Sequence, residues 1–412
     1  MNSHLLLRLC CKTPNRSYFR AFSSTRQPLI AAKSSFFSHN RWAKYPDHSN
    51  NSGEILSLQH IKSVEQHFDG FQESKILTPS QLVKLYAQLS KSHLTILVVL
   101  TAMSGVALSP FPATLPTLLS TAIGTALCSA SAMTLNQLQE VPFDAQMPRT
   151  RMRPLVRRAI SPLHAAGFAL ATGIGGPVLL WTTLNPTTAV LGAANIALYA
   201  GLYTWIKRKS ILNTWVGAVV GAIPPLMGWT ACGGQLFPSA DNPIQLFLPP
   251  FLSLTSVSTD LINNPLAPVA FTMLLFSWQF PHFNSLSHLV RSSYAQAGYW
   301  MLSSLSPSRN SLVALRHAVL LVPVCSVLFP LSGLTTWTFA LTTLVPNAVC
   351  VRAAWKFWRD RGEKNARVLF RHSLWYLPVI LALMMVHKQN MEWTEWIRPK
   401  ESETEGVAAP DR

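Results

Sequence analysis

The chain has 412 residues, of which 49% are hydrophobic and only 12% are charged, so its charged residues are too few to cover a soluble globule of this size. A lipid bilayer must therefore solvate much of the protein. The formal net charge of +17 would suggest a nucleic-acid partner in a soluble protein, but the basic residues lie in an N-terminal arm and in alternate loops. That placement is typical of membrane topology, and we expect no nucleic-acid partner.

The N-terminal arm, residues 1–46, is basic and rich in serine. It holds eight Lys or Arg residues, seven Ser residues and no acid. This composition is typical of a mitochondrial transit peptide, whereas a secretory signal has a compact apolar core. A basic tail without a targeting role is the alternative. Residues 47–90 are polar and mixed, and we interpret them as a linker that includes one helix around residues 79–90.

Apolar runs of roughly 17 to 22 residues recur from about residue 92 onward, and each can cross a hydrocarbon core of about 30 Å as a helix. We therefore predict an all-α, polytopic membrane protein with nine transmembrane helices in residues 91–388, followed by a polar C-terminal tail at 389–412. The predicted spans lie near 92–109, 115–136, 161–183, 187–206, 214–232, 264–281, 313–333, 335–354 and 371–387.

Basic residues fall in every second loop of this arrangement. By the positive-inside rule, the side that receives them faces the mitochondrial matrix, together with the N-terminus. Residues 246–258 are also apolar, but this run of about 13 residues contains Pro249 and Pro250, so we treat 233–263 as a surface or re-entrant excursion on the opposite side. The basic loops contain Arg149, Arg151, Arg153, Arg157 and Arg158, then Lys207, Arg208 and Lys209, then Arg291 and Arg309, and finally seven Lys or Arg from Arg352 to Arg371.

Only two acids occur between residues 74 and 240, Glu140 and Asp144, and both follow the second predicted span. An ionised carboxylate at membrane depth is costly, so its presence indicates a task that involves a cation or a proton. Asn136, Glu140 and Asp144 are spaced four apart, which places them on one face of a helix, although Pro142 must distort its last turn. Oxygen ligands at this spacing suit Mg²⁺, and the arginines just downstream suit a Mg²⁺-bound diphosphate.

Three stretches of the chain carry a resemblance to a known family. The run NQLQEVPFDAQMPRTRMRPL (Asn136 to Leu155) resembles the first signature of the UbiA superfamily of intramembrane prenyltransferases. Its NxxxE(VPF)DxxMxRTxxRP form is similar to the haem O synthase (protohaem IX farnesyltransferase) branch. The stretches YTWIKRKSILNTWVGAVVGAIPPLMGW (Tyr203 to Trp229) and FSWQFPHFNSLS (Phe276 to Ser287) agree with this branch, and the similarity extends over residues 84–388.

The resemblance implies roles for individual residues. Asn136, Glu140 and Asp144 match the metal and diphosphate positions, and Arg149 and Arg153 match their basic partners, so these five are the expected catalytic residues. The first three are the expected metal ligands. The expected substrate-binding residues are Lys207, Arg208, Asn213, Trp278, Gln279, His282, Asn284 and Tyr294.

One position departs from the family pattern. Family members continue the third stretch with an acidic pair before a tyrosine, whereas this chain has Ser292 and Ser293 before Tyr294. Ser293 therefore stands where the second carboxylate for Mg²⁺ is expected. Either the first stretch holds the metal with Gln279, Asn284 and water, or the activity of this chain is impaired.

The function that the resemblance implies is a transfer reaction in the mitochondrial inner membrane. The farnesyl group of farnesyl diphosphate would pass, with Mg²⁺ as cofactor, to a vinyl group of haem B, giving haem O for haem A and cytochrome c oxidase assembly. The implied partners are haem B, farnesyl diphosphate, membrane lipid and a downstream haem A synthase. The alternatives are a catalytically impaired haem-handling protein, a related prenyltransferase acting on a quinone precursor, and a transporter, although no internal repeat of two halves supports the last.

Overall fold

The computed structural model describes residues 78–240, 242–249, 252 and 263–389. These residues belong to one compact unit, Leu77–Arg412. The predicted transit peptide, the linker as far as residue 77 and the tail from residue 390 onward lie outside the described residues. Within the described ranges the chain is helical and has no β-strand, apart from one isolated bridge between Thr335 and Lys388. The all-α prediction is confirmed.

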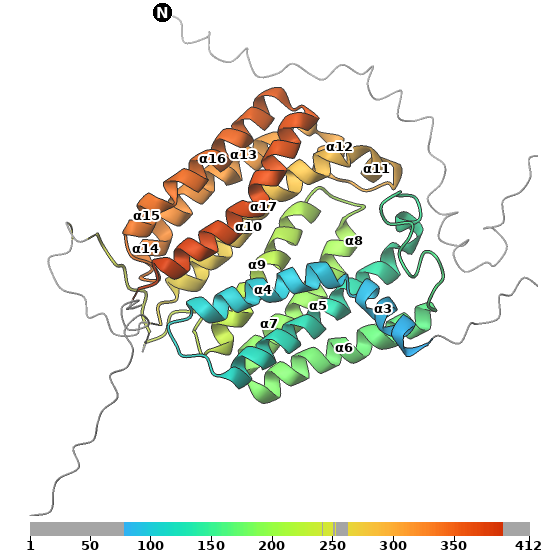
Figure 1. The fold of residues 1–412 in the computed structure, drawn as a ribbon, viewed down its shortest axis with the longest axis horizontal. Coiled ribbons are helices and arrows are strands. Elements are labelled where there is room, and N and C mark those ends of the chain that lie inside the picture. Colours follow the sequence, from blue (N-terminus) through green and yellow to red (C-terminus); the bar gives the residue numbers. More distant parts are fainter. Residues whose placement is uncertain (1–77, 241, 250–251, 253–262, 390–412) are drawn as a thin grey trace, which may run out of the picture. The chain divides into compact units, whose positions relative to one another are not determined.

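A helical segment lies at each of the nine predicted span positions (Figure 1). A further helix, α3 (Pro79–Leu89), precedes them, and two short helices, α11 (Arg291–Gln296) and α12 (Leu302–Leu305), follow the sixth. The nine segments are α4 (Ser92–Leu108), α5 (Leu115–Asp144), α6 (Pro162–Thr183), α7 with η2 and α8 (Pro186–Ile196, Ala197–Tyr203, Thr204–Ile206), α9 (Asn213–Ala231), α10 (Leu266–Leu289), α13 with η3 and α14 (Pro307–Pro323, Val324–Leu328, Phe329–Leu331), α15 with α16 (Thr338–Thr342, Leu344–Asp360) and α17 (Glu363–Val386).

The number of membrane crossings is a separate matter from the number of helical segments. Among the described residues, five helices are long and apolar enough to span a bilayer, or up to six when α3 and α4, bent by 60°, count as one broken span. A polytopic membrane protein is therefore confirmed, whereas the exact count of nine spans is not.

Helix α5 extends beyond the predicted span of residues 115–136, as the common helix face of Asn136, Glu140 and Asp144 requires. Its apolar run ends near residue 136, but the helix continues to Asp144 and encloses Pro142, so Glu140 and Asp144 lie within α5 rather than after it. The Thr114 side chain caps the other end by accepting a hydrogen bond from the backbone N–H of Thr117 at 3.3 Å. Hydropathy cannot predict the extension, because the added turns are polar and find their partners on other helices.

Two groups of helices meet at α9 and α10 (Figure 1). Helix α5 packs against α4, α6 and α7, while α10 packs against α13 and α17. Helix α4 lies very close to α9, since a Cβ added at Gly228 would lie 1.9 Å from the carbonyl oxygen of Ala102, and one at Gly105 would lie 2.0 Å from that of Pro225. Only glycine permits this backbone approach, which closes one wall of the interior.

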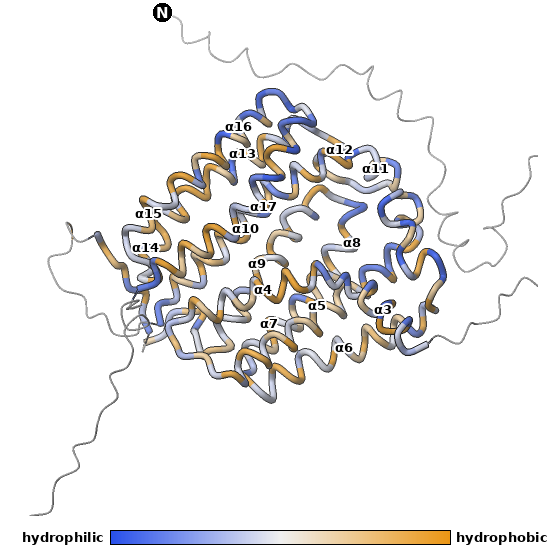
Figure 2. The backbone as a smooth tube through the Cα atoms, in the orientation of Figure 1, coloured by the Kyte–Doolittle hydropathy of each residue, from blue (hydrophilic) through white to orange (hydrophobic). Residues whose placement is uncertain are grey.

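The basic loops share one end of the helices. The side chain of Lys207 contacts Glu140 near the end of α5, and the Trp300 backbone N–H donates to the Lys207 carbonyl at 2.9 Å. Arg291 lies 3.8 Å from Glu363 at the start of α17. Figure 2 shows hydrophilic segments at the α8, α11 and α16–α17 connections and apolar stretches between them. The predicted alternation of loops agrees with these contacts.

At the opposite end of the helices, the remaining loops contact the ends of other helices. The Asn185 side chain donates to the Thr230 carbonyl at 2.6 Å, linking the loop before α7 to the end of α9. The backbone N–H of Phe247 donates to the Leu331 carbonyl at 2.9 Å, so the described part of the 233–263 excursion packs beside α14. This part contains no helix.

Candidate active site

The acidic residues of α5 form a buried network with basic residues from other segments. The side chains of Asn136, Glu140 and Asp144 share one face of the helix, and these residues are only 0%, 5% and 1% exposed. Lys207 Nζ donates to Glu140 Oε1 at 2.7 Å. Arg153, which follows α5, pairs with Asp144 and lies 3.9 Å from Glu140 Oε2. Two buried carboxylates are thereby held in place by two cations.

Lys91 completes the network and was missed by the sequence analysis. It occupies the break between α3 and α4 in a left-handed backbone conformation, with φ 48° and ψ 57°. Its Nζ donates to Asn136 Oδ1 at 2.9 Å, while Asn136 Nδ2 donates to Thr204 Oγ1 at 3.1 Å. The only sequence signal was a lysine just before an apolar run, which equally fits an ordinary interfacial anchor.

Lys207 and Arg208, the basic pair expected at the site, contact different partners. Lys207 lies over the Tyr203 ring, with Nζ 4.6 Å from the ring centre, in addition to its ion pair. The Arg208 guanidinium instead stacks 4.4 Å from the ring centre of Phe143 in α5. Tyr203 ends the π-helical segment η2, whose wider turn also places Tyr199 at 5.2 Å ring-to-ring distance from it. The π turn therefore supplies the aromatic wall that faces Lys207.

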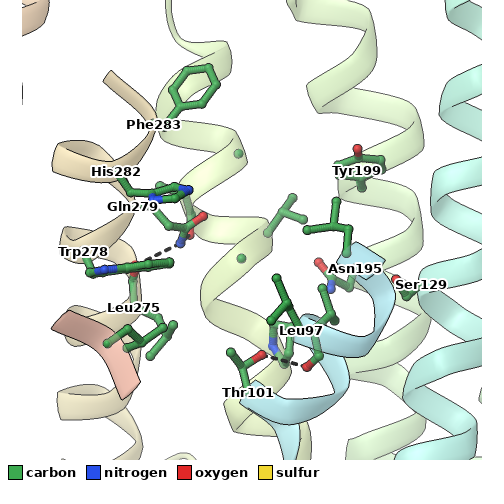
Figure 3. A pocket seen from close by; sticks show the side chains of 18 of the residues that line it. Leu97, Thr101, Ser129, Asn195, Tyr199, Leu275, Trp278, Gln279, His282 and Phe283 are labelled. Carbon is green, nitrogen blue, oxygen red and sulfur yellow. Dashed lines mark hydrogen bonds between the residues drawn. The ribbon is translucent and has the colours of Figure 1, made fainter. Parts of the chain in front are cut away.

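A cavity of about 700 Å³ lies between α4, α5, α7, α9, α10 and α17 (Figure 3). Its lining is mainly apolar, and Tyr203 links it to the charged network through Lys207. Trp278, Gln279 and His282 line one wall from α10, and Tyr199 lies across the space from them. The volume falls in the range of roughly 300–1,000 Å³ that is common for small-molecule sites. Charged groups thus adjoin a mainly apolar space.

The hydrogen bonds of His282 determine which ring nitrogen carries the proton. Ser373 Oγ of α17 donates to the Phe370 carbonyl at 2.6 Å, so its oxygen can only accept from His282 Nδ1, which is 2.9 Å away. The proton of the neutral ring therefore sits on Nδ1, and Nε2 keeps a lone pair. Trp278 stacks on the same ring at 4.9 Å and donates its Nε1–H to the Ser373 carbonyl at 2.9 Å.

Gln279 is held in the cavity wall by two backbone acceptors. Its Nε2 donates to the carbonyls of Ala218 and Leu275, both at 2.9 Å. The side chain rests directly on α9, because a Cβ added at Gly221 would lie 2.2 Å from Gln279 Oε1.

Two expected site residues lie outside the charged network. Arg149 is exposed and forms none of the ion pairs found in the described part of the chain. Asn284 is fully buried and exchanges hydrogen bonds with Asn310: each amide donates to the other residue's carbonyl, at 3.1 and 2.9 Å. This pair joins α10 to α13. The predicted roles of Arg149 and Asn284 gain no support from these contacts.

Two further expected residues lie beside the charged network, and one of them, Asn213, also lines the cavity. Asn213 Nδ2 donates to the carbonyls of Ser210 at 2.6 Å and Trp300 at 2.9 Å, which ties the α8–α9 loop to the segment after α11. Tyr294 is 8% exposed and packs with Met147 beside the network. Both residues therefore fix the position of neighbouring groups.

The oxygen atoms of the site determine whether it can bind the predicted Mg²⁺. Asp144 Oδ1 is buried without a hydrogen-bond partner, so it is a carboxylate oxygen free to meet a cation. Within the described ranges, no three His, Cys, Asp or Glu side chains come together as a metal cage. Mg²⁺ is commonly held by one or two carboxylates together with substrate phosphates rather than by such a cage. The residues therefore fit Mg²⁺ that is shared with a diphosphate.

Comparison with known proteins decides the family. The model of the UbiA prenyltransferase family matches residues 97–375. The chain belongs to this family. It is 44% identical over 339 residues to the Neurospora crassa "Protoheme IX farnesyltransferase, mitochondrial", covering 77% of this chain and 64% of that protein. The Homo sapiens protein of the same name is 41% identical over 347 residues, with 82% and 72% covered.

The fold agrees with this family membership. A UbiA homologue from Aeropyrum pernix K1, solved in its apo form, superposes with a TM-score of 0.53 at 19% identity and covers 71% of this chain and 97% of its own. The chain spans somewhat less than two thirds of the length of the Neurospora crassa relative. The family and its helical fold are thus shown.

Proposed function

We propose that this protein is a protohaem IX farnesyltransferase, which transfers the farnesyl group of farnesyl diphosphate to a vinyl group of haem B and so forms haem O. The observation that carries the proposal is the joining of Glu140, Asp144, Arg153 and Lys207 in one buried network beside an apolar cavity. The shared name of the relatives from Neurospora crassa and Homo sapiens supports haem B as the acceptor.

The charged network would hold the diphosphate. Mg²⁺ held by Glu140 and Asp144 would neutralise part of the diphosphate charge and so make it a better leaving group. Lys207 and Arg153 already lie against these carboxylates, and their N–H groups would bind the remaining phosphate oxygens. Lys91, whose pKa burial lowers to about 7, adds a third basic group through Asn136 and would gain its proton beside the diphosphate. These fixed charges favour the separated diphosphate over the ester.

The cavity would hold the farnesyl chain and the acceptor. When the carbon–oxygen bond breaks, the electron pair leaves with the diphosphate and an allylic cation remains. The vinyl group of haem B attacks it, forming a carbon–carbon bond, and water then adds and releases a proton. Apolar walls keep other water away from the cation, while Tyr199 and Tyr203 turn electron-rich rings toward the charged end.

His282 is the group we assign to the haem side of the cavity. Its Nδ1–H is engaged by Ser373, so its Nε2 lone pair would bind the haem iron or accept the proton that water releases. Trp278 stacks on the ring and restricts its rotation. The role of the histidine thus depends on the hydrogen bond that it donates to Ser373 of α17.

We further propose that the protein resides in the mitochondrial inner membrane with its charged network at the matrix side. The relatives carry "mitochondrial" in their names, and the apolar helices require a bilayer. The basic loops at the network's end support this orientation by the positive-inside rule. Haem O leaving the cavity would pass to a haem A synthase for cytochrome c oxidase assembly.

Product analysis tests the proposed reaction. The full chain in lipid nanodiscs would be incubated with haem B, farnesyl diphosphate and Mg²⁺, and the extracted haem analysed by mass spectrometry. We expect haem O to form and chelation of Mg²⁺ to abolish it. Transfer to a quinone precursor but not to haem B would point to the quinone branch, and absence of any transfer would contradict the enzymatic function.

A further inference from the structure

Tyr299 carries a buried hydroxyl group without a partner. The residue is 5% exposed, and its hydroxyl oxygen makes no hydrogen bond within the described part of the chain. A buried polar group in this state loses the hydrogen bonds that water would provide, and folded proteins rarely retain one without a reason. The group is therefore a candidate for binding a ligand.

Tyr299 lies beside the charged network. Its ring faces Phe143 of α5 at 5.8 Å and Tyr294 at 6.0 Å, and Lys207 Nζ lies 5.7 Å from its centre. The next residue, Trp300, donates its backbone N–H to the Lys207 carbonyl at 2.9 Å. The backbone of the lysine is thus tied to the segment that presents Tyr299, which holds the two side chains near each other.

The unpartnered hydroxyl is a hydrogen-bond donor. Burial, reinforced by the Glu140 carboxylate, raises the pKa of the Tyr299 hydroxyl above its ordinary value of 10.0, so the group is protonated at neutral pH. What it lacks is an acceptor. Arg153 and Lys207 offset the two carboxylates, and Lys91, whose pKa is lowered to about 7 by burial and by these two cations, can take up a proton when an anion enters. An acceptor that enters this site is therefore expected to be anionic.

We propose that Tyr299 binds the prenyl substrate by donating a hydrogen bond from its hydroxyl to an oxygen of the diphosphate group. This inference rests on the proposed function and names a residue outside the three stretches that carry the family resemblance. Near α11, the family has an acid where this chain has Ser293. The Tyr299 hydroxyl gives this side of the site an uncharged hydrogen-bond donor. Binding on that side then depends on a hydrogen bond rather than on a second carboxylate.

The substitution Tyr299→Phe tests this because it removes only the hydroxyl. The full chain in lipid nanodiscs would be titrated with inorganic diphosphate in the presence of Mg²⁺, and binding measured by calorimetry. We expect about tenfold weaker diphosphate binding, as for loss of one hydrogen bond to a charged acceptor. We also expect the thermal unfolding midpoint of the ligand-free protein to stay the same or rise, because the hydroxyl has no partner to lose.

Tyr376→Phe is the matched control. The Tyr376 hydroxyl is also buried but donates to Asn347 Oδ1 at 2.5 Å, away from the charged network. This variant should lower the unfolding midpoint and leave diphosphate affinity within twofold of wild type. Diphosphate affinity unchanged by Tyr299→Phe, or a lowered midpoint without ligand, would overturn the inference. The probe contains no haem, so weakened diphosphate binding supports the inference even in a protein that fails to form haem O.

Discussion

Lys207 donates a hydrogen bond to Glu140 at 2.7 Å, which joins the loop after α8 to the end of helix α5, 67 residues away, at a position where both side chains are nearly buried. Breaking such a pair by removing one partner typically costs about 3–5 kcal/mol, because the other charge remains buried. We expect Lys207→Met to destabilise the fold by roughly this amount, measured by thermal unfolding in nanodiscs.

The double variant Lys207→Met with Glu140→Gln separates stability from binding. Removing both charges should restore much of the lost stability, since no unpaired ion remains. Diphosphate binding should still be weaker than in the wild type, because the Lys207 charge that would bind the phosphate oxygens is absent. Additive destabilisation by the two substitutions would mean that they are not energetically coupled.

Asp144→Asn tests the carboxylate that has a free oxygen. The substitution keeps the shape of the side chain and an oxygen that can accept a hydrogen bond from Arg153. It removes the negative charge that would bind Mg²⁺. We expect at least about a hundredfold loss of haem O formation, equal to about 2.7 kcal/mol, with the protein still inserted. Glu363→Gln is the control, because Glu363 is half exposed and its ion pairs in the described part of the chain are with Arg291 and Arg367. It should change turnover less than twofold, and equal effects of the two substitutions would remove Asp144 from the site.

Ser373→Ala tests the orientation of His282. Loss of the hydroxyl leaves His282 Nδ1–H without its acceptor, so the ring is free to turn and present the wrong nitrogen. We expect a raised KM for haem B and an unchanged affinity for diphosphate. Ser373→Thr, which keeps the hydroxyl, should restore the wild-type KM. If alanine and threonine behave alike, the hydroxyl does not orient the histidine.

Gly228→Ala tests the contact between α4 and α9. Its Cβ would lie 1.9 Å from the Ala102 carbonyl oxygen, so the helices must separate, and we expect destabilisation of about 1–3 kcal/mol or more. The control is Gly175→Ala in α6, where a Cβ would meet nothing within 4 Å. Alanine there should be neutral or stabilising by about 0.5–1 kcal/mol. Unfolding midpoints of the two variants in nanodiscs give the comparison, and similar midpoints would contradict the close approach.

The helices were predictable because hydropathy reports the bilayer directly. The apolar runs gave the positions of the helical segments, and the spacing of Asn136, Glu140 and Asp144 gave their common face. The polar end of α5 was not predictable in this way. It is helical because Lys207 and Arg153 satisfy its acids from elsewhere in the chain.

The charged site was predictable in part. Five arginines follow α5, and composition alone cannot separate Arg153, which reaches both acids, from Arg149, which is exposed. Lys91 reaches the site because of the bend between α3 and α4. Tyr299 reaches it because the segment after α11 packs against Lys207. Those are tertiary contacts, and no local pattern encodes them.

The most direct test of the central claim compares the two products of one reaction. With haem B, farnesyl diphosphate and Mg²⁺ present, the diphosphate released and the haem O formed would be quantified in the same sample. Our account predicts equal amounts in the wild type and the loss of both in Asp144→Asn. Diphosphate release without haem O, or haem O formation that survives this substitution, would contradict it.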